Sequence, residues 1–390
     1  MIIMACRHKE LQKALQGYVK TGIALIADNN GVLDPAGFSD DIGIYYFIPK
    51  LANIGSLSLD QAIDVFFYGI IVITFLSGLV GLMFLYREWL NRIIAAMGIC
   101  LFAWIAFVSG RIYEVYVVAP SLVIGIFPWI LLFTKKNKNK ATIVGFLFML
   151  GIIIGYAHVV RSHSGTPVLL FLIICILGKR YSTQKFKVLL LTVLMLGLML
   201  PKLHFHFLVH SRNTYLKQNR QTYESIIPKH PFWHTVYIGF GFLDNQYGIK
   251  YQDEVATQKV KELSPSAGYL SKEYEDTLRD EVFQLIETNP HFVLRTVAAK
   301  MRTIFFYFFI FSNVGLLCAV LYPKKWYVEL AFWCALAFSA LFGIIAIPSL
   351  PYTSGLLAIA AVYGVISVNH AIGSGMLIWI GLPMRKKERG

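Results

Sequence analysis

The chain has 390 residues, of which 56% are hydrophobic and only 15% are charged, and its formal net charge is +14. About a quarter of the residues of a soluble domain are charged, so this composition excludes an ordinary soluble globular protein and indicates an integral membrane protein. The lysine and arginine excess is expected to fix the topology and to contact anionic lipid headgroups. No nucleic-acid partner is expected, because no basic stripe with interleaved aromatic residues stands apart from the apolar runs.

Long apolar runs follow one another along most of the chain. A helix that crosses a bilayer needs roughly 20 mostly apolar residues. Two runs, Pro167–Leu177 and Val188–Leu200, reach that length only with flanking residues or in a thin local bilayer. The pattern predicts an all-α, polytopic transmembrane helical bundle of about nine spans. The runs are Val65–Tyr86, Ile93–Ser109, Val115–Phe133, Ala141–Val160, Pro167–Leu177, Val188–Leu200, Thr303–Tyr322, Val328–Ile347 and Ser354–Val368.

Basic clusters follow every second run, which is the alternation expected when positively charged connections stay in the cytoplasm. This orientation makes residues 1–64 an outer N-terminal segment and residues 65–201 the first six helices. Residues 202–302 then form a mostly helical extracytoplasmic loop or small domain, and residues 303–390 form the last three helices and a basic cytoplasmic tail. The clusters are Arg87–Arg92, Lys135–Lys140, Gly178–Lys187, Pro323–Lys325 and Met384–Arg389.

The N-terminal segment poses a topological problem. An outer N-terminus normally requires a preceding span, yet residues 1–39 contain no apolar run of about 18 residues. The sequence therefore favours a chain that lacks a first helix, through a late start-codon assignment or a truncated gene. The alternative is an N-terminal tail that crosses the membrane unaided.

The outer loop contains recognisable helix signals. Ser271 is expected to cap a helix that ends at Asn289-Pro290, because serine favours the N-cap and proline ends helices. Residues 291–302 are expected to form an amphipathic helix that leads into the next span. The aromatic and glycine-rich stretch Phe232–Tyr251 is expected to be an irregular loop packed on the membrane surface.

Two adjacent carboxylates, Asp40 and Asp41, precede an aromatic segment that leads to the first apolar run. Two neighbouring acids can serve as a general base and a metal ligand. Either residue could instead cap a helix, since aspartate favours that position. The residues alone leave both readings open, and with them a divalent cation held by Asp40 or Asp41.

Further polar residues lie in the predicted outer connections. Arg111 and Glu114 are one helical turn apart, and they form either a simple ion pair or a phosphate-binding cation oriented by an acid. Arg161, followed by His163, either holds phosphate oxygens or only extends its charge to the interface.

The outer loop begins with a histidine-rich stretch around Arg212. Its histidines have no neighbouring acid to complete a zinc site, so they are interpreted as interfacial residues. The following segment starts at His230, contains His234 and Tyr237, and ends at Asp253. Its aromatic, glycine, amide and acid residues are typical of a sugar-stacking surface, and the alternative is a loop that packs onto the bilayer.

With this topology, the chain resembles the GT-C glycosyltransferases. It is most similar to family-39-like bacterial membrane proteins related to protein mannosyltransferases and aminoarabinose lipid A transferases. That family is expected to begin with a span before the acidic pair, and this chain departs from it there. The resemblance covers essentially the whole chain and rests on Asp40-Asp41, Arg111-x-x-Glu114, Arg161-Ser-His-Ser-Gly and His230-Pro-x-Trp-His-x-x-Tyr-x-Gly-x-Gly.

The resemblance implies a membrane enzyme that moves a sugar from a polyprenyl-phosphate donor to a glycan, lipid or protein acceptor. It implies a bacterial inner membrane location with the site on the periplasmic face, and Asp40 or Asp41 as the catalytic base. The alternative is a non-enzymatic carrier or flippase-like protein for lipids or lipid-linked sugars. The residues expected to bind the donor phosphate or substrate are Arg111, Glu114, Arg161, His163, Arg212, His230, His234 and Tyr237.

Overall fold

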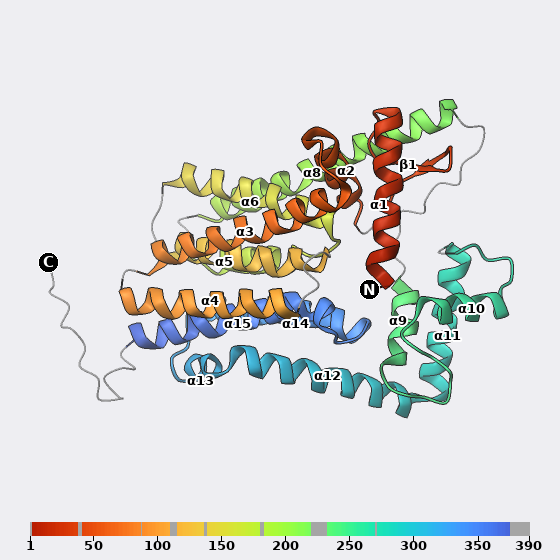
Figure 1. Cartoon of the computed structure of the whole chain (residues 1–390). Coiled ribbons are helices and arrows are strands. Elements are labelled where there is room, and N and C mark those ends of the chain that lie inside the picture. Colours follow the sequence, from red (N-terminus) through yellow and green to blue (C-terminus); the bar gives the residue numbers. More distant parts are fainter. Residues whose placement is uncertain are drawn as a thin grey trace.

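The computed structural model describes residues 2–37, 41–86, 88–109, 115–135, 139–179, 183–219, 232–269 and 271–374. Long helices lie side by side through most of the molecule, and shorter elements gather at the right-hand end of this bundle (Figure 1). The long helices and their continuations are α3 (Leu59–Leu85), α4 (Trp89–Ser109), α5 (Val118–Lys135), α6 (Lys140–Val160), α7 (Thr166–Gly178), α8 (Gln184–Asn219), α12 (Pro290–Ser312), α13 (Val314–Leu321), α14 (Trp326–Ile345) and α15 (Leu350–Gly373).

Among the described residues, six helices are long and apolar enough to cross a membrane. The bent pair α12 and α13, which meet at an angle of 79°, would make a seventh. Helix α7 and the apolar part Trp89–Cys100 of α4 are shorter. These helices indicate a multi-pass membrane protein built as a helical bundle, while the total of nine spans stays a prediction.

Successive long helices alternate in direction. In Figure 1 the end of α3 and the start of α4 lie at the left-hand end of the bundle, as do the end of α5 and the start of α6, and α13 meets α14 there too. The N-terminal elements and α9–α11 lie at the opposite end. The described basic residues that flank these connections, among them Arg92, Lys140, Lys179 and Lys325, therefore share one end of the bundle.

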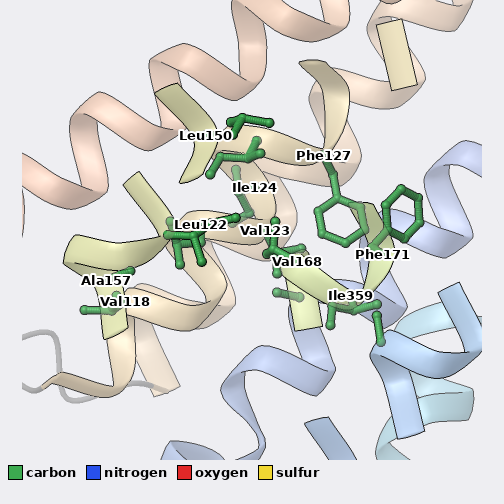
Figure 2. Close-up of a cluster of buried hydrophobic side chains, with 14 of the residues drawn as sticks. Val118, Leu122, Val123, Ile124, Phe127, Leu150, Ala157, Val168, Phe171 and Ile359 are labelled. Carbon is green, nitrogen blue, oxygen red and sulfur yellow. The ribbon is translucent and has the colours of Figure 1, made fainter. Parts of the chain in front are cut away.

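The core of the bundle is aromatic where α5, α7 and α14 meet. The ring of Phe127 lies 4.5 Å from that of Phe171, which lies 4.8 Å from that of Phe332, measured between centroids. Figure 2 shows Phe127 and Phe171 beside Ile359 of α15. Interlocking side chains of this kind hold helices together in a bilayer, where burial of apolar area supplies no driving force.

Helices α6 and α8 cross so closely that their backbones touch at glycine residues, where a side chain would not fit. A Cβ atom added to Gly151 would collide with the carbonyl oxygen of Leu194, and one added to Gly197 would collide with that of Phe148. Small residues that let two backbones approach are the usual means by which helices associate in membranes.

This crossing gives a first prediction. We expect Gly151→Val to lower the free energy of unfolding by about 1–3 kcal/mol, because the added side chain would force the two backbones apart. The matched control is Gly145→Val on the same helix, since among the described residues no atom outside its own stretch of helix lies within 4 Å of its Cβ position. Thermal unfolding in detergent compares the two variants, and equal melting temperatures would contradict the close crossing.

The N-terminal segment folds across the end of the bundle. Helix α1 (Ile2–Thr21) runs across the direction of the spans, followed by a hairpin and then by α2 (Ile44–Gly55) (Figure 1). The hairpin consists of β1 (Ile26–Asn29) and β2 (Val32–Pro35), paired antiparallel around a two-residue turn. This small sheet is a departure from the all-α expectation, which otherwise describes the fold.

Four short elements form a separate unit at the same end, which we call the α9–α11 unit. They are α9 (Phe232–Gly239), the 3-10 helix η2 (Phe240–Phe242), α10 (Asp253–Leu263) and α11 (Lys272–Thr288). As predicted, Ser271 caps α11 by accepting a hydrogen bond of 3.1 Å from the Tyr274 amide, and the helix ends before Asn289.

The expectation that Phe232–Tyr251 is irregular is wrong for its first half, which is helical. The carboxylate of Glu275 in α11 accepts hydrogen bonds from the amides of Trp233 and His234, at 2.9 and 3.2 Å. An acid at a helix N-terminus satisfies free amide groups and stabilises the helix dipole. Helix α9 thus begins on a cap supplied by a distant part of the chain.

Candidate functional site

A buried ion pair lies where the N-terminal elements meet the bundle. The Asp41 carboxylate is 3.0 Å from the Arg7 guanidinium of α1, and the two side chains are 2% and 24% exposed. The N-cap residue of α2 is Gly43, two residues after Asp41. The acid is therefore held by a cation from a different element.

A close backbone contact brings Asp41 towards α6. The amide of Gly43 donates a hydrogen bond of 2.9 Å to the carbonyl oxygen of Val159 near the end of α6. A Cβ atom at Gly43 would lie 2.9 Å from that oxygen and 3.0 Å from the Cα atom of Val160. Because Arg161 follows directly as the C-cap of α6, the contact places Asp41 and Arg161 in the same region.

The Arg161 guanidinium lies over the ring of Tyr116, with 4.8 Å between Cζ and the ring centroid. Tyr116 belongs to the 3-10 helix η1 (Val115–Val117), whose backbone accepts a hydrogen bond of 3.0 Å from Ser354 of α15. Such stacking uses the face of the guanidinium. Its N–H donors lie in the plane of the group and point to the sides, where a ligand could approach.

A row of three tyrosines continues from Arg161 to the α9–α11 unit. Tyr116 lies 5.1 Å from Tyr352 of α15, which lies 6.2 Å from Tyr251, measured between ring centroids. Side-chain hydrogen bonds join Tyr352 to both neighbours. The row, Tyr116–Tyr352–Tyr251, fixes the position of Arg161 relative to the loop before α10.

Electrostatic interactions unite these groups. Burial lowers the pKa of Arg7, but the Asp41 carboxylate and the tyrosine hydroxyls of Tyr116 and Tyr45 raise it, while the positive charge of Arg161 opposes them. The net result is an Arg7 pKa above its ordinary value. The charges of three residues therefore interact electrostatically. We call these residues, Arg7, Asp41 and Arg161, the Arg7–Asp41 cluster.

The guanidinium of Arg7 is incompletely bonded. Within the part of the chain that the structure describes, Nη1 of Arg7 is buried and has no hydrogen-bond partner. A buried donor without an acceptor costs about 1–3 kcal/mol, and more when it is charged. The atom is therefore a ready contact for an anionic ligand that enters beside Asp41.

The remaining expected residues in this part of the bundle are placed separately. His163 is exposed in the turn after α6, with a φ of +62° and its ring centroid 6.4 Å from that of Phe342. Arg212 is buried on α8 and donates a hydrogen bond of 3.0 Å to Asn213. Binding roles for both stay predictions.

His234 and Tyr237 are buried inside the α9–α11 unit rather than on a stacking surface. The imidazole of His234 is bonded to the Tyr274 hydroxyl at 2.7 Å and to the Asp253 carboxylate at 3.0 Å. Burial raises the pKa of Tyr237 to about 12. Both side chains support the unit from within, and direct contact with a substrate stays a prediction.

Four of the residues expected from the sequence, Asp40, Arg111, Glu114 and His230, lie outside the described residues. In the described ranges no group of three or more histidine, cysteine, aspartate or glutamate side chains could hold a metal ion. The Asp41 carboxylate is paired with the Arg7 guanidinium, and a divalent cation held by Asp40 or Asp41 stays a prediction.

Sequence reasoning missed Arg7, Tyr116, Tyr251 and Tyr352. Comparison with protein-family models gives no match, and comparisons with curated proteins and with solved structures give none either. The geometry and the chemistry of the side chains are therefore the basis for a function.

The Gly43 contact gives a second prediction. We expect Gly43→Val to separate α2 from α6, because its side chain would overlap the backbone of Val159 and Val160. Labelling of Arg7 and Arg161 by phenylglyoxal, measured by peptide mass spectrometry, should increase several-fold. Gly55→Ala in α2 is the control, since its Cβ would meet only the flexible side chain of Leu57. Unchanged labelling in Gly43→Val would contradict the proposed placement of the two arginines.

Proposed function

We propose that the chain is a GT-C type glycosyltransferase that moves a sugar from a polyprenyl-phosphate donor to an acceptor at the membrane surface. The observation that carries the proposal is the Arg7–Asp41 cluster. It combines a buried carboxylate with two guanidinium groups, and a buried donor atom of Arg7 has no partner among the described residues. The cluster lies at the end of the apolar bundle, where a lipid-linked substrate would present its polar head.

Asp41 is the proposed general base. Transfer requires removal of a proton from an acceptor hydroxyl or amine, and a carboxylate positioned beside the acceptor can accept it. Arg7 supplies the counter-charge that a buried carboxylate needs. Asp40, the neighbouring acid in the sequence, remains the second candidate for this role.

The arginines are the proposed phosphate ligands. Cleavage of the donor leaves negative charge on the polyprenyl phosphate, and guanidinium groups stabilise it through charge-assisted hydrogen bonds. Arg7 contributes Nη1, which has no acceptor in the described part of the chain, and Arg161 is held by the ring of Tyr116. A carrier of lipid-linked sugars would need the same cations but no base, so Asp41 separates the two functions.

Activity assays with purified protein provide the third prediction. We expect Asp41→Asn to reduce transfer from a polyprenyl-phosphate sugar by about 10²–10⁴. Arg7→Gln and Arg161→Gln should each cost about ten- to a hundredfold, because a hydrogen bond to a charged group contributes about 1.5–3 kcal/mol. Glu10→Gln is the control, since it removes a partly exposed acid that pairs with Lys13 on α1.

A double variant separates catalysis from folding. Asp41→Asn leaves the buried charge of Arg7 without its partner, which typically costs 3–5 kcal/mol, as a rough guide. Arg7→Gln combined with Asp41→Asn removes both charges, so its melting temperature should recover while its activity should not. Wild-type activity in the double variant, or a wild-type protein that transfers sugar from no polyprenyl donor, would refute the enzyme in favour of a carrier.

The proposed location is a bacterial inner membrane with the cluster on the periplasmic face. The basic connections at the other end favour that orientation. As a fourth prediction, Ser266→Cys in the exposed turn between α10 and α11 should react with an impermeant maleimide in intact spheroplasts. A cysteine at Lys325, before α14, should react only after permeabilisation. The reverse pattern would overturn the orientation.

A further inference from the structure

An exposed carboxylate in the α9–α11 unit is held in place by buried groups. The side chain of Asp253 is 71% exposed, whereas that of His234, 3.0 Å away, is 6% exposed. His234 is in turn bonded at 2.7 Å to the hydroxyl of Tyr274, whose ring is buried. The pKa of Asp253 lies below its ordinary value, mainly because His234 donates a hydrogen bond to it. The result is an ionised acid with a fixed position and an open face.

Helix geometry accounts for only part of this arrangement. Asp253 is the first residue of α10, where any acid stabilises the helix dipole, and the adjacent Glu254 does the same. The two acids differ in that buried His234 and Tyr274 orient Asp253. Fixing an exposed side chain costs conformational entropy during folding. The fixed orientation then lowers the cost of binding a ligand that must meet the group in one orientation.

The carboxylate lies near the tyrosine row. Tyr251, two residues before Asp253, is half-buried and packs against Tyr352. Burial raises the pKa of Tyr251, and both Asp253 and Arg161 act on its hydroxyl electrostatically. Tyr251 therefore lies near both the fixed acid and the guanidinium that is proposed to hold the donor phosphate.

This combination fits a sugar ring. A carboxylate has two acceptor oxygens, which match two neighbouring hydroxyl groups. A tyrosine supplies an apolar face on which the carbon side of the ring can pack and a hydroxyl for a further hydrogen bond. Small-molecule sites commonly combine such an apolar wall with a few precisely placed polar groups.

We propose that Asp253 and Tyr251 form the subsite for the sugar of the lipid-linked donor, with Asp253 binding ring hydroxyls and Tyr251 packing against the ring. The inference rests on the proposed function, because the donor phosphate is placed at Arg7 and Arg161. It assigns the sugar to the α9–α11 unit and the lipid phosphate to the bundle, so the two parts of one substrate are recognised by two parts of the chain.

The test compares the binding of two kinds of short-chain probe in detergent, measured by how the melting temperature depends on probe concentration. The first is citronellyl phosphate without a sugar. The second is a panel of citronellyl phosphates that carry glucose, mannose, galactose, N-acetylglucosamine or 4-amino-4-deoxyarabinose. The wild type should bind at least one sugar-bearing probe about tenfold more tightly than the bare phosphate. The absence of this preference across the panel would overturn the proposal.

Variants of Asp253 and Glu254 test which residue is responsible for the preference for the sugar-bearing probe. Asp253→Asn should bind citronellyl phosphate as the wild type does but lose the tenfold preference for the sugar. Glu254→Gln, which removes the neighbouring exposed acid of the same helical turn, should retain it. If Asp253→Asn lowers the melting temperature without ligand, Asp253→Glu keeps the charge but displaces it and should still lose most of the preference. Retention of the preference in both Asp253 variants would refute the subsite.

The same measurements separate this proposal from the proposed function. Arg7→Gln and Arg161→Gln should weaken binding of the bare phosphate and of the sugar-bearing probes alike. If they weaken neither, the phosphate site and therefore the proposed function fail. If they weaken both while Asp253→Asn behaves as Glu254→Gln does, only the sugar subsite fails.

Discussion

A guanidinium and a carboxylate that leave water each lose several kcal/mol of hydration, and only a close partner compensates for this loss. Asp41 is almost fully buried beside Arg7, so the segment before α2 can take its position only when α1 lies across the end of the bundle. The hydrogen bond from Gly43 to Val159 fixes the same segment on α6. These two restraints, an ion pair and a backbone hydrogen bond, determine how the N-terminal elements sit and place the acid at the end of the spans.

The rest of the site depends on that placement. Arg161 is the C-cap of α6, and the tyrosine row joins this residue through Tyr352 of α15 to Tyr251 in the loop before α10. Each of these residues comes from a different region of the chain, and the spans bring them to one level. The lengths and crossings of the apolar helices therefore determine where the polar groups of the proposed site lie.

Features with local causes could be predicted from the sequence. The apolar runs gave the long helices, and Ser271 gave the start of α11 because an N-cap acts on amides within the next turn. The hairpin also has a local signal that was overlooked, Asn30-Gly31, whose positive φ values suit a two-residue turn. Helix α9 was missed because its cap, Glu275, lies 42 residues from Trp233. Arg7 was missed for the same reason, since nothing within α1 distinguishes it from the other basic residues until Asp41 is placed beside it.

A second buried ion pair differs from the Arg7–Asp41 pair in how completely its groups are bonded. At the opposite end of the bundle, Lys324 lies 2.8 Å from Glu329 and donates a hydrogen bond of 2.7 Å to Ser367. The other oxygen of Glu329 accepts a hydrogen bond of 2.9 Å from Tyr363. That network fastens the turn after α13 to α15, and it needs no further molecule because its charged groups are bonded to one another. In the Arg7–Asp41 cluster, by contrast, a buried guanidinium nitrogen has no acceptor among the described residues. Since a buried polar group is normally satisfied, this donor is the observation behind the anionic ligand that we propose at the cluster.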